Sequence, residues 1–293
     1  MARRLSRIEL ICRDPDRLAA FYEVALGFIK LIGPEDIPNT ASASITLRLG
    51  QQDIRLIGAR PTGQPYSAHV AGWSPLFQRI AIVVSDMTGA YAHLSTIHGW
   101  TPISTAGPQV LPIASGGAEA FKFRDPEGHP LELIAFAPNA TPVQWQRTSD
   151  NCCIGIDHSA VSVSNTLRSI AFYESLGLHR AASSLNMGQE QAKLDDIPNA
   201  TVEVSALTPE RATPHVELLC YRGDFDRCIR PQAVNDATAT RLVFTVESRT
   251  MLEMICLRHH DRVLSGPILV NNNFSGALLR DPDGHLISLE AEI

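Results

Sequence analysis

One six-residue phrase occurs twice in this sequence, and the repetition constrains the fold more than any other feature. Segment 124–129 reads Arg-Asp-Pro-Glu-Gly-His, segment 280–285 reads Arg-Asp-Pro-Asp-Gly-His, and each leads into an apolar run. Similar segments repeated at a nearly constant spacing indicate a duplicated domain. Two further pairs of similar segments keep almost the same spacing, namely 20–28 with 171–178 and 36–39 with 196–199.

The duplication predicts two domains, residues 1–138 and 152–293, joined by a linker over 139–151. The linker is rich in polar residues and has no apolar periodicity. Each half reads as two units, each made of a strand, a helix and further strands. The first helix, for example, is expected to begin after Asp14, with Pro15 in its first turn, and to end at Gly27. The predicted fold class is α+β, with curled sheets whose concave faces form cups.

Composition excludes several classes of function. The formal net charge is −6 and the pI about 5.9, so the chain lacks the basic surface that nucleic acids or anionic membranes require. No apolar run is long enough for a secretory signal or a membrane span. The six cysteines form no CxxC pair, which favours reduced thiols in a cytoplasmic protein. A small molecule is therefore the expected partner.

The repeated phrases and the helices before them resemble the vicinal oxygen chelate superfamily, which includes glyoxalase, bleomycin-resistance proteins and extradiol dioxygenases. The resemblance is carried by the Asp-Pro helix start at 14–15, the Phe-Tyr and Leu-Gly pairs within 20–28 and 171–178, and both Asp-Pro-acid-Gly-His turns. It covers nearly the whole chain and implies four βαβββ modules arranged as two tandem glyoxalase-like domains. It does not specify one reaction, because this fold supports several chemistries.

The resemblance also implies where a divalent metal ion would bind, since family members place ligands on the first and last strands of each module. In the first half those positions hold Arg7, Arg55, Arg79 and Glu132. A guanidinium has no lone pair to donate to a metal ion. The N-terminal cup is therefore expected to be free of metal.

In the second half the corresponding positions hold His158, Glu217, Arg241 and Ser288. Only His158 and Glu217 are metal-ligand types, so the expected cofactor is none or a single divalent ion (Fe, Mn, Ni or Zn) in the C-terminal domain. His215 and Glu290, each two residues from a ligand position, could compensate. Without a metal, His158 and Glu217 would perform acid–base catalysis, with Arg241 polarising a substrate oxygen. A purely structural His158 is the alternative.

Three interpretations of Arg7, Arg55 and Arg79 remain open. They could form an anion-binding site with Glu132 and Ser288 as further substrate contacts, or internal salt bridges around Glu132 with help from Glu9. A strand register shifted by one residue would instead expose them to solvent. Several buried arginines near one glutamate favour an anionic ligand, because buried charges must be paired.

The sequence thus predicts a small-molecule enzyme of the glyoxalase and dioxygenase superfamily, with lyase, isomerase or ring-oxygen chemistry. Its substrate would carry an anionic or vicinal-oxygen group and could be aromatic. The alternative is a metal-free protein that binds and sequesters a small molecule, as resistance proteins do. A third view makes one half purely structural. The sequence leaves open whether a homodimer completes the cups.

Overall fold

The structure, a computed structural model, describes residues 1–31, 43–68, 70–146, 151–211, 213–225, 232–271 and 274–292. It confirms the α+β class. The helices are α1 (Pro15–Leu26), α2 (Met87–Ser95), α3 (Thr166–Leu176), α4 (Gln189–Asp195) and α5 (Arg249–Arg258), with 3₁₀ turns η1 (Ile113–Ser115) and η2 (Val143–Trp145). Strands of the first half are β1 (Ala2–Cys12), β2 (Ile29–Lys30), β3 (Ser44–Leu49), β4 (Gln52–Gly58), β5 (Gln78–Val84), β6 (Thr101–Pro102), β7 (Gln109–Val110), β8 (Glu119–Arg124) and β9 (Pro130–Ala135). Those of the second half are β10 (Cys153–Ser162), β11 (His179–Met187), β12 (Thr201–Thr208), β13 (His215–Tyr221), β14 (Arg241–Val246), β15 (Val263–Asn271), β16 (Phe274–Arg280) and β17 (Leu286–Glu292).

The four predicted units are present, and each opens with a strand followed by a capped helix. The caps accept hydrogen bonds from backbone N–H groups of the first turn, which otherwise have no partner. α1 and α3 end at glycines in the left-handed conformation, as their sequences predict. The cap residues are Asp14, Asp86, Asn165 and Ser248.

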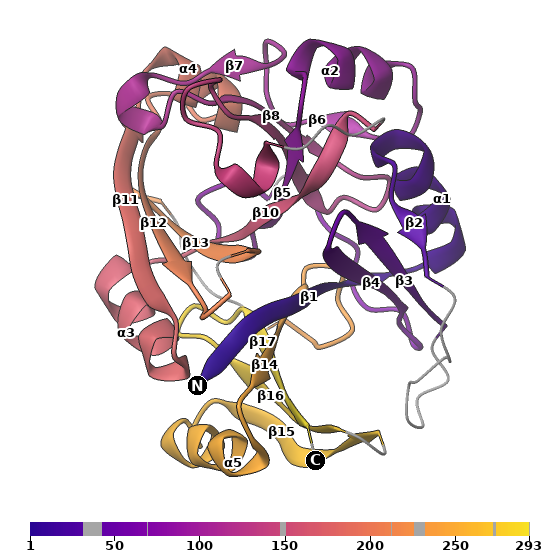
Figure 1. Cartoon of the computed structure of the whole chain (residues 1–293), viewed down its shortest axis with the longest axis vertical. Helices are drawn as coiled ribbons and strands as arrows, with labels where there is room; N and C mark the ends of the chain where they lie inside the picture. The colour runs from indigo at the N-terminus through magenta and orange to yellow at the C-terminus, as the bar shows by residue number, and fades with distance from the viewer. Residues whose placement is uncertain are drawn as a thin grey trace.

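The sheets are not formed within the halves, which corrects one expectation. One sheet has the order β15-β16-β17-β14-β1-β4-β3-β2 and joins unit four to unit one. The other has the order β11-β12-β13-β10-β5-β9-β8-β6 and joins unit three to unit two. β1 pairs antiparallel with β14, and β5 with β10. Figure 1 shows both sheets curled, with α1, α2, α3 and α5 at the periphery. The domain boundaries 1–138 and 152–293 therefore remain a prediction about the duplicated halves of the sequence. In the structure, each curled sheet contains strands from both halves.

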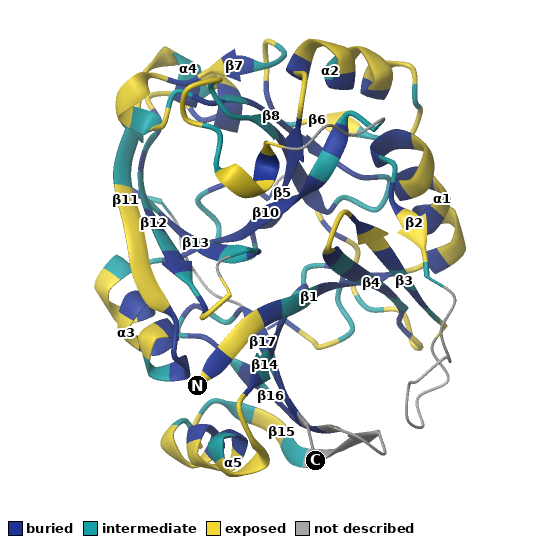
Figure 2. Cartoon of the chain, in the orientation of Figure 1, coloured by how far each residue is buried: buried dark blue, intermediate teal, exposed yellow. Residues whose placement is uncertain are grey.

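The core fills the space between the sheets and these helices. In Figure 2 the central strands are mostly dark, and exposed residues lie on the outer helix faces, in loops and on edge strands such as β11. The largest buried side chains include Tyr22, Tyr173, Phe121, Phe123 and Phe244, so the tyrosines of both repeated Phe-Tyr pairs pack in the core. None of the described helices is long and apolar enough to cross a membrane.

The duplicated turns are tied to the helices by the same contact in each copy. Asp125 accepts hydrogen bonds from the backbone N–H groups of Glu127 (2.8 Å) and His129 (3.0 Å), and from the hydroxyl of Tyr22 (3.1 Å). Gly128 closes this turn at φ = 96°, a conformation that favours glycine. In the second copy Asp281 accepts equivalent bonds, including one of 3.1 Å from the Tyr173 hydroxyl.

The duplication supplies a matched stability prediction. Tyr22→Phe and Tyr173→Phe each remove a buried hydroxyl that donates to an aspartate, so each is expected to lower the free energy of unfolding by about 1–2 kcal/mol. The two tyrosines belong to α1 and α3, which lie on opposite sides of the molecule in Figure 1, so the double variant should lose the sum. Urea denaturation of the three variants measures this. A loss confined to one tyrosine would show that the copies are not energetically equivalent.

Some sequence predictions fall outside the described residues. The repeat at 36–39, part of the linker (147–150) and Cys228 are among them. Cys12, Cys152, Cys153, Cys220 and Cys256 are free thiols. α4 was not predicted; it lies between β11 and β12 of unit three.

Candidate functional site

The cross-pairing of units regroups the eight predicted site residues. We name the concave face of the β15-to-β2 sheet cup A and that of the β11-to-β6 sheet cup B. The eight side chains alternate along their strands with core residues such as Ile8, Ile80 and Leu242, and therefore point away from the core. Cup A receives Arg7, Arg55, Arg241 and Ser288, and cup B receives Arg79, Glu132, His158 and Glu217.

This regrouping separates residues that the sequence placed together. Arg241 lies on β14 in cup A, whereas His158 and Glu217 lie on β10 and β13 in cup B. The predicted set of Arg7, Arg55, Arg79 and Glu132 is likewise split between the sheets. The N-terminal cup that was expected to be metal-free is therefore not formed as predicted.

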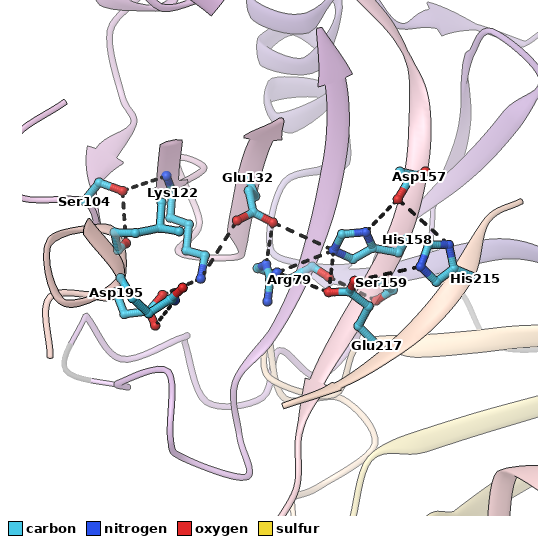
Figure 3. Close-up of polar contacts among 12 residues, drawn as sticks. Arg79, Ser104, Lys122, Glu132, Asp157, His158, Ser159, Asp195, His215 and Glu217 are labelled. Atoms are coloured by element: carbon cyan, nitrogen blue, oxygen red, sulfur yellow. Dashed lines mark hydrogen bonds and ion pairs between the residues drawn. The ribbon is translucent and has the colours of Figure 1, made fainter. Parts of the chain in front are cut away.

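His158 is the centre of cup B and is held at both ring nitrogens (Figure 3). Its Nδ1 lies 2.9 Å from Asp157 Oδ2. Its Nε2 lies 3.1 Å from Glu217 Oε2 and 3.4 Å from Arg79 Nη2. An imidazolium can donate from Nε2 to Glu217, and a neutral imidazole protonated at Nδ1 can accept there from Arg79. Each protonation state of His158 thus has a partner.

A β-bulge explains how two consecutive residues of one strand meet. The pairing of β10 with β5 shifts register between Ile156 and His158, so Asp157 is not turned to the opposite face as simple alternation would require. Asp157 Oδ1 accepts a hydrogen bond of 2.9 Å from Trp145 Nε1 of η2. The carboxylate is therefore fixed from two sides, and it fixes the ring of His158 in turn.

Arg79 and Glu132 form a buried ion pair beside His158. Arg79 Nε lies 2.8 Å from Glu132 Oε2, and Arg79 Nη2 lies 3.5 Å from Glu217 Oε2. Burial alone lowers the pKa of Arg79, but the two carboxylates outweigh it and raise that pKa, so the side chain is a permanent cation. The interpretation of Arg79 as part of an internal salt bridge fits this geometry. Arg79 Nη1 is buried without a hydrogen-bond partner among the described residues.

Glu217 and His215 form the more accessible side of the cluster. Their side chains are 18% and 16% exposed, against 3% for His158. His215 Nε2 lies 3.9 Å from Glu217 Oε1, and its Nδ1 lies 3.9 Å from Asp157 Oδ2. Two imidazoles and two carboxylates thus form a closed ring of titratable groups, drawn in Figure 3.

The charges in this ring shift its pKa values in opposite directions. Burial alone raises the pKa of Glu217, but His158, His215 and Arg79 outweigh it and hold that pKa well below its usual range. Burial alone lowers the pKa of His215, but its contact with Glu217 and the charge of Asp157 outweigh it and raise that pKa above its ordinary value. At neutral pH Glu217 is therefore ionised, and His215 holds a proton more strongly than an unperturbed histidine does.

A stability prediction follows from His215. Because its folded pKa is above its unfolded value, protonated His215 stabilises the fold fully below that unfolded value, near pH 6.5, and this contribution is lost as pH rises through the folded pKa. The difference in unfolding free energy between the native protein and His215→Gln should therefore shrink as pH rises from about 6 to 9. Chemical denaturation across that range measures it. A difference that grew with pH would contradict a raised pKa.

A second charged pair, which the sequence analysis did not predict, extends the cluster of cup B beyond Glu132. Lys122 on β8 contacts Asp195, the last residue of α4, and its Nζ lies 3.9 Å from Glu132 Oε1. Asp195 also accepts hydrogen bonds from Gln191 (2.6 Å) and Tyr221 (2.9 Å). No sequence motif indicates this pair, because Lys122 belongs to unit two and Asp195 to unit three, which the sequence assigns to different halves.

Cup A holds the other arginines in a different arrangement. Arg7 binds Glu290 through both terminal nitrogens, at 2.9 and 2.5 Å, and donates from Nε to Glu9 at 2.9 Å. Arg241 Nη1 lies 3.6 Å from the other oxygen of Glu9. Arg55 Nε donates to Thr46 at 3.3 Å. An apolar cluster of Ile11, Ala59, Ala239 and Leu286 adjoins these strands.

The donor set of cup B does not fit a divalent ion at the family's position. Glu132, His158 and Glu217 are suitable ligands, but the guanidinium of Arg79 lies among them. A like charge at that place opposes a metal cation. A second group, Asp157, His158 and His215, has donor atoms within 4.8 Å of one another, although its shortest contact is already used as the hydrogen bond from His158 to Asp157.

Comparisons with known proteins agree with the predicted resemblance. Residues 4–133 match the model of the Glyoxalase/Bleomycin resistance protein/Dioxygenase superfamily. A point mutant of glyoxalase I from Zea mays is similar in structure, with 18% identity and a TM-score of 0.65 over 98% of this chain and 93% of that one. The unmutated enzyme gives 18% identity and 0.60, over 98% and 92%. A Bacillus subtilis protein provisionally named a dioxygenase gives 14% and 0.60, over 99% and 86%. No curated protein sequence matches the chain.

Proposed function

We propose that this chain is a small-molecule enzyme that moves a proton in cup B. The chain has the glyoxalase fold throughout, and its residues 4–133 match the glyoxalase, bleomycin-resistance and dioxygenase superfamily. The reaction class is that of an isomerase or lyase. The substrate carries a carbonyl or enol oxygen beside an acidic carbon. The observation that supports this most is the ring of His158, Asp157, Glu217 and His215.

We assign a role to each group of this ring. His215 is partly exposed and has a raised pKa, which suits a residue that gives and takes a proton near neutral pH. Glu217 stays ionised and orients both imidazoles. His158 is almost fully buried behind Glu217, so it acts by positioning and charging that carboxylate.

Arg79 replaces Arg241 as the group that polarises a substrate oxygen. Its Nη1 is a buried donor without a described partner, and burying an N–H group without an acceptor is costly. A substrate oxygen that gains negative charge during proton transfer would satisfy it. A fixed donor aimed at a developing oxyanion is an effective way to lower a reaction barrier.

Proton exchange in D₂O tests the function even where the product is not identified. The native protein is incubated with α-hydroxyaldehydes, α-hydroxyketones and aryl analogues that carry a carboxylate, and loss of the C–H signal is followed by NMR. Exchange that is catalysed by the native protein and slowed in His158→Gln supports the proposal. Exchange that persists unchanged in His158→Gln removes His158 from the mechanism.

A binding function for cup A is the second candidate, and the gathering of Arg7, Arg55 and Arg241 favours it. The described carboxylates of that face include Glu9 and Glu290, which contact Arg7 and Arg241, and Asp53, which pairs with Arg48. Together with the adjoining apolar cluster, the three guanidiniums suit an organic anion with an apolar body. Affinity for an aryl carboxylate should then fall as salt rises. Affinity that is independent of salt would speak against this site.

A further inference from the structure

Arg79 occupies the point on which three metal-ligand side chains converge. Glu132 Oε2, His158 Nε2 and Glu217 Oε2 lie 2.8 Å from its Nε and 3.4 and 3.5 Å from its Nη2, respectively. The carboxylate oxygens of Glu132 and Glu217 lie 3.8 and 3.1 Å from His158 Nε2. Two ligands of one zinc-like ion, with bonds of about 2.0–2.2 Å, lie roughly 3.0–3.5 Å apart. Both carboxylate oxygens thus already lie near the distance from the imidazole nitrogen that a single ion would need.

The duplicated architecture shows where the fourth donor would come from. Arg79 precedes the helix cap Asp86 by the same interval as His158 precedes the cap Asn165. The two residues lie on neighbouring antiparallel strands, where Arg79 is opposite Ala160, two residues from His158. A histidine at position 79 would therefore face the same point from the other strand.

We infer that the guanidinium of Arg79 does the work of a divalent ion in this protein, and that this one residue keeps cup B free of metal. It supplies a fixed positive charge to Glu132 and Glu217. Because the guanidinium is a permanent cation, the protein does not have to bind a metal ion to provide that charge. The inference concerns the same cup as the proposed function, but its readout is metal binding rather than turnover.

Metal titration of matched variants tests the inference. The native protein and Arg79→His are freed of metal with a chelator and titrated with Co²⁺ and Ni²⁺ by calorimetry, and the Co²⁺ complex is examined by visible absorption. We expect no ion in cup B of the native protein and one ion per chain in Arg79→His. The affinity of Arg79→His for that ion should be at least 100-fold higher than any affinity of the native protein for the same metal. The double variant Arg79→His/His158→Ala should lose that ion.

Arg241→His is the matched control, because position 241 is the equivalent of 79 in cup A, where the other equivalent positions hold Arg7, Arg55 and Ser288. It should gain no ion. If Arg79→His unfolds without metal, recovery of a cooperative melting transition on adding Ni²⁺, absent in the double variant, gives the same answer.

Two outcomes would overturn the inference. One is a stoichiometric ion in the native protein that is lost in His158→Ala, since that ion would use cup B despite Arg79, through either ligand group. The other is a folded Arg79→His that binds no ion. Neither result would remove the proton-exchange proposal, which is decided by turnover alone.

Discussion

Arg79→Met is expected to lower the free energy of unfolding by about 3–5 kcal/mol at pH 7. Glu132 is 4% exposed at its side chain and has Arg79 as its nearest cation, at 2.8 Å. Removing the guanidinium leaves that carboxylate buried beside Lys122, at 3.9 Å and already engaged with Asp195, and His158 Nε2, at 3.8 Å and already in contact with Glu217. A buried charge without its partner is among the most destabilising changes a single substitution can make.

Guanidinium chloride denaturation measures the loss, and two controls give it meaning. Arg48→Met removes a similar pair with Asp53 at 2.7 Å, but at a surface where Arg48 is 46% exposed, so it should cost at most about 1 kcal/mol. Arg79→Met/Glu132→Gln removes both charges and should recover part of the loss. Equal effects of Arg79→Met and Arg48→Met would show that the cup B pair is solvated.

Glu217→Gln is expected to lower the rate of proton exchange by up to about 10²–10⁴-fold, the usual contribution of general acid–base catalysis, because His215 loses the carboxylate that orients it. The amide keeps the size of the side chain but removes the charge that His158 and His215 share. The pKa of His215 should then fall, because contact with Glu217 is the largest influence that raises it. The alkaline limb of the pH–rate profile should move to lower pH in the residual activity.

The same exchange assay applied to Ser288→Ala decides between the cups. Ser288 in cup A is the counterpart of Glu132 in cup B, and its replacement should leave exchange unchanged. If Ser288→Ala abolished exchange while Glu217→Gln did not, the reaction would belong to cup A. A lower rate in Glu217→Gln with an unmoved pH profile would instead indicate damage to packing.

The sequence was informative where structure is local. The helix cap Asp14, the turn at Gly128 and the inward-facing positions of the strands could be predicted, because each depends on a few consecutive residues. The family resemblance is supported by the match over residues 4–133 and, for the fold, by glyoxalase I. Substrate, cytoplasmic location and oligomeric state remain predictions.

The composition of each cup could not be predicted, because strand alternation shows which face a residue occupies but not which strand lies beside it. Arg79 and His158 belong to different halves of the sequence, yet they lie on paired strands. Asp157 was overlooked because a residue next to an inward-facing histidine should point outward, and only the bulge in β10 changes this. α4 and its Asp195 were not predicted, because the sequence of α4 has no similar segment in the first half.

The exchange of strands between the halves changes the meaning of the segment that joins them. A linker between two self-contained domains acts as a hinge, and cutting it would release two separate bodies. Here β1 is held to β14 and β5 to β10, so each half is bound to the other along two seams. The two halves of the chain are therefore joined as tightly as the two subunits of a dimer that share their sheets. A proteolytic nick between residues 139 and 146 should leave both cups assembled as a two-chain complex.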